Sequence, residues 1–190
     1  IIMELYSIDW SPWVRKVRIS AIERKIEDKI KLIPTNIGFA DKTLKIVESN
    51  LTTLNPSGRV PTLITDDDQV IYDSTVIVHY LDSIGSENPI ISNSLNKKIT
   101  GLKINALVDE VVDSLRHLSL ENRRDKNIRL PDWLDALDTK VKRGITVIES
   151  NLKNLSDTNV NVLDIADISV IILLGTIKRN PKSQYDIFST

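Results

Sequence analysis

The spacing of apolar residues changes near residue 86, and this change constrains the fold more than any other sequence feature. Before it, short alternating segments typical of strands take turns with segments of helical spacing. Beyond it, the apolar patterns keep helical spacing only. We therefore predict an α/β domain over residues 1–84, a linker rich in Gly, Ser, Asn and Pro over 85–94, and an all-α helical domain over 95–190.

The predicted order in the first domain is strand, helix, strand, short helix, hairpin and helix. The expected positions are a strand in 2–7, a helix after Ser11 and Pro12, a strand in 30–37, a short helix in 41–50, strands after Pro61 and at 70–72, and a helix from Ser74 to a stop at Gly85. In the first helix the apolar residues share one side, so Arg15, Lys16 and Arg18 are expected to turn mostly outward.

Three helices are predicted in the second domain. Apolar residues spaced by three and four indicate long helices through 104–118 and 134–155, joined by a solvated basic loop, with Gly144 at a close crossing. The third helix is expected to begin after Asp164, which can serve as its N-cap. Because that helix is apolar nearly all round, we expect it at the centre of the bundle.

Composition excludes several classes of function. The chain has no cysteine, which rules out a disulfide scaffold, a thiolate zinc site and chemistry by a cysteine of its own. Two histidines, His79 and His117, are too few for a multi-histidine metal site and are predicted to be structural. A net charge of −1 argues against nucleic acid as the main partner.

Targeting signals are not evident in the sequence. The start, IIMELYS, lacks the charged region and cleavage site of a signal peptide. The most apolar run, ISVIILLGTI, is shorter than the about 20 residues of a membrane-spanning helix. We expect a cytoplasmic protein without a membrane partner. The first residue is not Met and the last residues carry no helix stop signal, so we expect the natural ends to differ and the carboxyl end to continue.

Three local motifs carry polar groups whose roles the residues alone leave open. Ser11 is predicted to be a helix N-cap, and its hydroxyl either serves the cap only or also faces a ligand. Asp73 and Ser74 begin a helix, where capping is favoured and capture of an amino-acid-like ligand is the alternative. Base rates alone favour a trans Val60–Pro61 bond, whereas a cis bond would expose the Val60 backbone to a ligand.

Four separated segments resemble the glutathione transferase family: YSIDWSPWVRKVRI, LNPSGRVPTL, VIYDSTVIVHYLD and LDIADISV. They follow the order of that family, and SPWVRK and DSTVI are similar to its serine-type bacterial branch. The resemblance implies a thioredoxin-like domain followed by a helical domain, and a homodimer with glutathione as its substrate. It implies a detoxifying enzyme that activates the glutathione thiol for attack on small electrophiles or peroxides. The alternative is a non-catalytic binding or regulatory protein of this fold, similar to the starvation proteins.

By this resemblance, Ser11 would be the catalytic residue. Its hydroxyl would donate a hydrogen bond to the glutathione sulfur and, together with the positive end of the helix, stabilise the thiolate. Tyr6, at the end of the first strand, is the runner-up because tyrosine-type members carry their catalytic hydroxyl there. Trp10 and Trp13 are candidates for lining the electrophile pocket.

The same resemblance assigns the glutathione-binding residues, and it implies no metal. The Val60 backbone, beside a cis Pro61, would pair with the cysteinyl part of glutathione. Asp73 and Ser74 would hold the γ-glutamyl end. Arg59 would contact the glycine carboxylate, where other members often carry a lysine.

Overall fold

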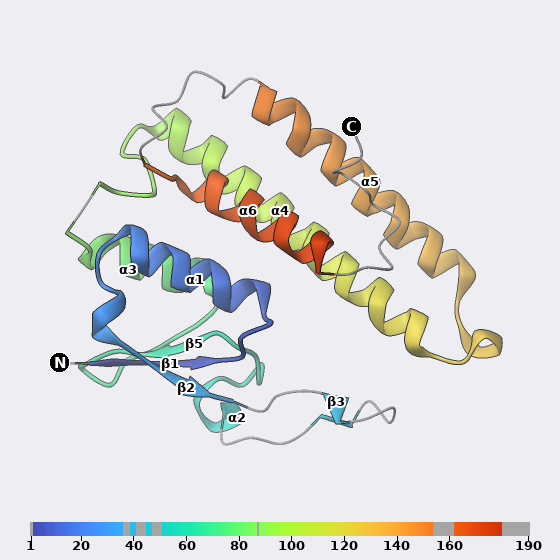
Figure 1. Cartoon of the computed structure of the whole chain (residues 1–190), viewed down its shortest axis with the longest axis horizontal. Coiled ribbons are helices and arrows are strands. Elements are labelled where there is room, and N and C mark those ends of the chain that lie inside the picture. Colours follow the sequence, from blue (N-terminus) through green and yellow to red (C-terminus); the bar gives the residue numbers. More distant parts are fainter. Residues whose placement is uncertain are drawn as a thin grey trace. The chain divides into compact units, whose positions relative to one another are not determined.

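The computed structural model describes residues 2–35, 39–40, 45–46, 51–86, 88–153 and 162–179. Backbone contacts divide the chain into two compact units, Ile1–Asn93 with Val162–Asp164, and Ser94–Asn161 with Ile165–Thr190. The first unit holds a small mixed sheet with helices, and the second is helical (Figure 1). The predicted fold class is therefore confirmed.

A four-stranded sheet in the order β2-β1-β5-β6 forms the base of the first unit. Its strands are β1 (Met3–Ser7), β2 (Ile30–Pro34), β5 (Thr62–Ile64) and β6 (Val70–Ile71). β1 pairs parallel with β2 and antiparallel with β5, and β5 pairs antiparallel with β6. β1 and β6 therefore run in the same direction. Leu5 lies opposite Leu32 and Leu63 in register, and both Leu5 and Leu63 are fully buried.

Helices cover both faces of this sheet. α1 (Pro12–Glu23) and α3 (Ser74–Ile84) lie on one side, and the short α2 (Leu51–Leu54) lies on the other (Figure 1). α1 packs against α3, and the 3-10 turn η1 (Glu27–Lys29) leads into β2. α1 follows β1 and α3 follows β6, so the two helices run in the same direction and begin at the same edge of the sheet.

The short helix expected in 41–50 is wrong where the structure describes that segment. Lys45–Ile46 is a strand, β4, which pairs antiparallel with β3 (Phe39–Ala40). Ile46 is β-branched and suits a strand, and the pairing satisfies backbone groups that a lone helical turn would leave open. The other residues of 41–50 lie outside the described part of the chain.

The outward orientation expected for Lys16 is also wrong. Lys16 is only 1% exposed, because α1 buries a wide stripe that includes Val14 before it and Val17 and Ser20 after it in the sequence. Arg15 is partly buried, and Arg18 is exposed as predicted.

The second unit contains the three predicted helices. α4 (Leu95–Arg123) is followed by the 3-10 turn η3 (Lys126–Ile128), α5 (Pro131–Lys153) and α6 (Ile165–Lys178). α4 packs against both α5 and α6. Leu155, the last apolar residue assigned to the second helix, lies outside the described residues. Within the described ranges, no helix has the length and apolar character needed to cross a membrane.

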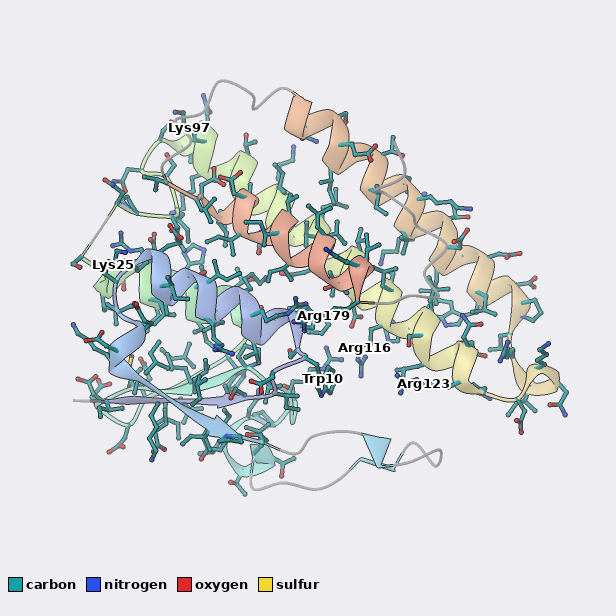
Figure 2. The ribbon with its side chains drawn as sticks, viewed as in Figure 1. Trp10, Lys25, Lys97, Arg116, Arg123 and Arg179 are labelled. Atoms are coloured by element: carbon teal, nitrogen blue, oxygen red, sulfur yellow. The ribbon has the colours of Figure 1, made fainter. Side chains whose placement is uncertain are left out.

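Close contacts fix how α4 packs in this unit. Ser169 Oγ donates to Asn105 Oδ1 at 3.0 Å in the buried α4–α6 contact. Figure 2 labels Lys97 near the start of α4, Arg123 at its end and Arg179 just beyond α6. Gly144 of α5 lies against Val111 of α4, which confirms the predicted close crossing.

The expectation that the third helix lies at the centre of the bundle is wrong. Ile171 and Leu174 of α6 are 43% and 36% exposed, while Ile168 and Ile172 are buried. α6 therefore buries one side, and α4 is the helix that contacts both of the others.

Replacing Gly144 with alanine should destabilise the protein, although alanine is the better helix former. A Cβ at this position would lie 2.3 Å from Val111 Cγ2. Overpacking of this kind costs about 1–3 kcal/mol, against a gain in helix propensity of at most about 1 kcal/mol. Urea denaturation should show a lower free energy of unfolding, whereas the exposed Arg143→Ala should change it by less than about 0.5 kcal/mol. A Gly144→Ala protein as stable as the parent would contradict the crossing.

Candidate functional site

Ser11 begins α1 as the predicted N-cap. Its backbone is extended, Pro12 occupies the first turn, and its Oγ accepts a hydrogen bond from the Val14 N–H at 3.4 Å. A hydroxyl has one proton to donate and two lone pairs. The cap uses one lone pair, and the structure gives this hydroxyl no further hydrogen bond to a described residue. Ser11 therefore caps the helix and still has a proton to offer a ligand.

The aromatic residues around Ser11 differ in exposure. Tyr6 alternates in β1 with the buried Leu5 and Ser7, so its side chain points to the opposite face of the sheet from theirs. Trp10 is 64% exposed and stands immediately before α1 (Figure 2). Trp13 is half-buried on α1.

Asp73 and Ser74 begin α3. Asp73 is the N-cap, and its Oδ1 accepts hydrogen bonds from the N–H groups of Thr75 at 3.0 Å and Val76 at 3.4 Å. Asp73 Oδ2 faces no hydrogen-bond donor among the described residues, and the Tyr72–Asp73 bond is cis. Ser74 is buried, and its N–H and hydroxyl bond to no described residue. The cap thus uses two of the N–H groups that were predicted to bind a ligand carboxylate. The N–H and hydroxyl of Ser74 are the donors that remain for such a carboxylate.

The turn that enters β5 carries Arg59, Val60 and Pro61. The Val60–Pro61 bond is cis, as the resemblance implies and against the base rate. Val60 lies just before the strand, and its backbone N–H and C=O make no hydrogen bond to a described residue. Arg59 is exposed, while Pro61 is buried.

Asn55 holds this turn together, although it is not among the site residues predicted from the sequence. Its Oδ1 accepts from the Ser57 N–H at 2.9 Å and from Ser57 Oγ at 2.7 Å. Its Nδ2 donates to the Arg59 carbonyl at 3.1 Å and to Thr62 Oγ1 at 3.0 Å. Asn55 is 1% exposed. An Asn that opens a turn bonds the backbone two residues on, and this local signal could have identified it.

Topology brings these three segments to one edge of the sheet. Thr62, the first residue of β5, pairs with Tyr6 near the end of β1, so Val60 and Pro61 lie beside the segment that leads to Ser11. β6 runs parallel to β1 and ends just before Asp73. The edge therefore carries two helix N-termini, one free stretch of backbone and one exposed arginine.

Positive partial charge gathers at this edge, because each helix N-terminus carries the equivalent of about half an elementary charge. Such an edge suits a thiolate and a carboxylate, while the Asp73 carboxylate suits an ammonium group. Farther along α3, burial raises the pKa of the Tyr80 phenol, and the charges of Asp66 and Asp67 add to the effect. Tyr80 is therefore neutral at pH 7 and lends no charge to the site.

The remaining candidates are at other positions of the chain. His79 is half-buried within α3. His117 in the second unit lies 3.6 Å from an Asp113 oxygen and contacts the Trp133 ring, with ring centroids 6.4 Å apart. Arg129 of the basic loop donates to the carbonyls of Arg124 and Asn122, so it braces its own loop. In the described ranges, no group of three or more His, Cys, Asp or Glu side chains could hold a metal ion.

Comparison with known proteins points to one family. A family profile described as "Glutathione S-transferase, N-terminal domain" matches residues 10–84. A glutathione transferase family member from Pseudomonas fluorescens Pf-5, solved with bound glutathione, is 29% identical, with a TM-score of 0.82 over 93% of this chain and 83% of that one. A glutathione S-transferase from Methylobacillus flagellatus KT, solved with glutathione bound, is 30% identical, with a TM-score of 0.78 over 94% of this chain and 84% of that one.

Curated relatives agree with these structures. The Escherichia coli "Uncharacterized GST-like protein YibF" is 26% identical over 91% of this chain and 81% of its own length. "Glutathione S-transferase Z1" from Arabidopsis thaliana is 26% identical over 80% of this chain. The chain spans just under two thirds of that plant relative, 66% of its length.

Asn55→Ala should loosen the turn at the site. The change removes all four hydrogen bonds of a buried side chain and leaves the Arg59 carbonyl with one partner fewer. We expect the free energy of unfolding to fall by about 1–3 kcal/mol, and amide hydrogen exchange at residues 57–62 to accelerate. Ser57→Ala removes only the hydrogen bond from the exposed Ser57 hydroxyl to Asn55, so it should lower the free energy of unfolding by less than about 1 kcal/mol. Equal effects of the two variants would show that Asn55 does not organise the turn.

Proposed function

The chain belongs to the glutathione S-transferase family. We propose that it binds glutathione at the edge of the sheet where α1 and α3 begin and where the turn before β5 ends. The observation that carries this proposal is the state of Ser11: its Oγ accepts the cap hydrogen bond and retains a proton to donate. Solved relatives with bound glutathione support the same ligand for this chain.

The chemistry of glutathione fits the groups at this edge. The ammonium of its γ-glutamyl end would bind Asp73 Oδ2, and the neighbouring carboxylate would bind the Ser74 N–H and hydroxyl at the positive end of α3. The peptide N–H and C=O of the cysteinyl part would pair with the unbonded backbone of Val60. The glycine carboxylate would reach Arg59.

Thiol activation would fall to Ser11. A thiol has a pKa near 8.5, and a hydrogen-bond donor together with a helix N-terminus favours the thiolate and lowers this pKa. Each unit of lowering corresponds to about 1.4 kcal/mol of preference for the anion. The thiolate, not the serine, then attacks the electrophile. Tyr6 points to the other face of the sheet from Leu5 and remains the runner-up.

These assignments make the chain a serine-type glutathione transferase that acts on small electrophiles or peroxides. Trp10 and Trp13, before and on the first turn of α1, are proposed to contact the electrophile. The alternative is a non-catalytic protein that keeps the glutathione site. Glutathione binding without turnover would favour that alternative. The cytoplasmic location stays a prediction from the sequence.

Ser11→Ala should shift the activity profile to higher pH. Without the donor the bound thiolate is less stable, so its pKa rises, and each unit lowers the thiolate fraction at pH 7 by up to about tenfold. Loss of the cap should also cost about 1 kcal/mol of stability. The measurement is conjugation of 1-chloro-2,4-dinitrobenzene from pH 6 to 9. Tyr6→Phe is the control and should leave the profile unchanged; if Tyr6→Phe abolishes activity and Ser11→Ala keeps it, the catalytic residue is Tyr6.

Asp73→Asn should weaken glutathione binding while preserving the fold. Asparagine keeps an oxygen for the Thr75 and Val76 N–H groups and is an equally good N-cap. It loses the charge that would hold the ammonium, which should cost about 1.5–3 kcal/mol of binding free energy. Isothermal titration calorimetry measures this difference, with Asp66→Asn in the exposed turn before β6 as the matched control. Unchanged affinity in Asp73→Asn would reduce Asp73 to a cap.

A second copy of the chain is proposed as the partner, as in the dimers of this family. Exposed apolar side chains on α3 (Val76, 51%) and at the start of α4 (Leu95, 71%; Ile99, 50%) are available for such an interface. Light scattering at micromolar concentration should give twice the 21.5 kDa chain mass. Val76→Asp should shift the mass toward one chain, and Ile128→Asp in the exposed loop after α4 should not. A parent protein with the mass of one chain would contradict the dimer.

A further inference from the structure

A buried arginine joins the C-terminal ends of α1 and α3. Arg24 is the C-cap of α1 and is 4% exposed. Its Nε lies 3.2 Å from Asp82 Oδ1, and its Nη2 donates to the carbonyls of Asp82 at 3.0 Å and Gly85 at 2.7 Å. Because the last carbonyls of a helix lack partners within the helix, the guanidinium satisfies two groups that α3 leaves open.

The partners of Arg24 are themselves held in place. Asp82 accepts hydrogen bonds from the N–H groups of Ile90 at 2.8 Å and Ile91 at 3.3 Å, and both isoleucines are buried. Gly85 leaves room for the arginine, since a Cβ there would lie 2.6 Å from both Arg24 Cβ and Nε. The Gly85 φ of −74° is open to any residue, so the reason for glycine is the space that Arg24 occupies.

Directional hydrogen bonds of this kind can fix the position of one helix along the axis of its neighbour, which apolar packing leaves free. α1 packs against α3, and both helices bury aliphatic side chains, among them Val17, Ile77 and Leu81. Apolar burial is non-directional, so it resists separation of two helices more than a slide along their axes. The rigid guanidinium fork bonds one helix end at set angles and distances and therefore opposes such a slide.

The opposite ends of the same helices carry the site. α1 and α3 run in the same direction, so Arg24 and Asp82 mark one end of the pair, and Ser11 and Ser74 mark the other. Figure 2 labels Trp10 and Lys25, which flank the two ends of α1. We propose that Arg24 and Asp82 are positioning residues of the glutathione site: they set the axial register of α1 against α3 and so the spacing between the Ser11 and Ser74 hydroxyls. This inference rests on the proposed function, because that spacing matters only if one ligand spans both ends.

Arg24→Met and the milder Arg24→Lys test the pair. The matched control is Lys31→Met, which removes a cation from the exposed Lys31–Glu4 ion pair of the same unit. We expect Arg24→Met to raise the Kd for glutathione and to raise the pKa of the bound thiol, which is read from thiolate absorbance at saturating glutathione. Turnover should slow by roughly 10- to 100-fold, because a small misplacement remote from the chemistry has effects of this size. Arg24→Lys should lie between Arg24→Met and the parent, and Lys31→Met should match the parent. A merely stabilising role would not move the thiol pKa of the folded complex.

A ligand-free readout separates this inference from the proposed function. Because the chain has no cysteine, Asp9→Cys and Tyr72→Cys can carry the only two spin labels, one beside the start of α1 and one at the exposed residue just before the N-cap of α3. Electron paramagnetic resonance on labelled protein diluted with unlabelled protein should show a shifted or broader distance distribution when Arg24 is replaced. Arg24→Lys serves this test if Arg24→Met does not fold. An unchanged distribution in a folded Arg24 variant would overturn the positioning role, whereas a parent that fails to bind glutathione would overturn the proposed function.

Discussion

The parallel packing of α1 against α3 is the constraint on which the candidate site depends. Both helices follow strands that run in the same direction, so both N-termini open at one edge of the sheet. Each N-terminus needs a cap, which Ser11 supplies for α1 and Asp73 for α3. The cap leaves the hydroxyl proton of Ser11 and the Oδ2 atom of Asp73 unused. Capping and ligand binding are therefore compatible here, because a hydroxyl or a carboxylate has more hydrogen-bonding capacity than a cap consumes.

The third component of the site is a stretch of backbone, and its position depends on a buried amide. Asn55 bonds the turn at four points, and the strand that follows begins opposite Tyr6 of β1. Val60 thus lies beside the segment leading to Ser11, with backbone groups free to pair with a peptide. A helix pair that attracts negative charge and a backbone edge that pairs with an amide together suit a small anionic peptide.

Helix caps and one close helix crossing were predictable from the sequence, whereas the partners of buried charged side chains were not. The caps at Ser11 and Asp73 follow from residue type and from the apolar pattern beside them, and the close crossing at Gly144 follows from a small residue in an amphipathic helix. Lys16 was misplaced because burial depends on what packs over α1. The ion pair between Arg24 and Asp82 joins residues 58 apart in the sequence, and no local pattern reveals such a partner. The strand at Lys45–Ile46 escaped detection because its partner, not its composition, determines it.

A crystal structure of the protein with bound glutathione would test the proposed site as a whole. We expect the sulfur to lie within hydrogen-bond distance of Ser11 Oγ, the γ-glutamyl carboxylate to lie at Ser74 with its ammonium at Asp73, and the cysteinyl backbone to pair with Val60. Glutathione bound away from the N-termini of α1 and α3, or with its sulfur on the Tyr6 hydroxyl, would contradict it.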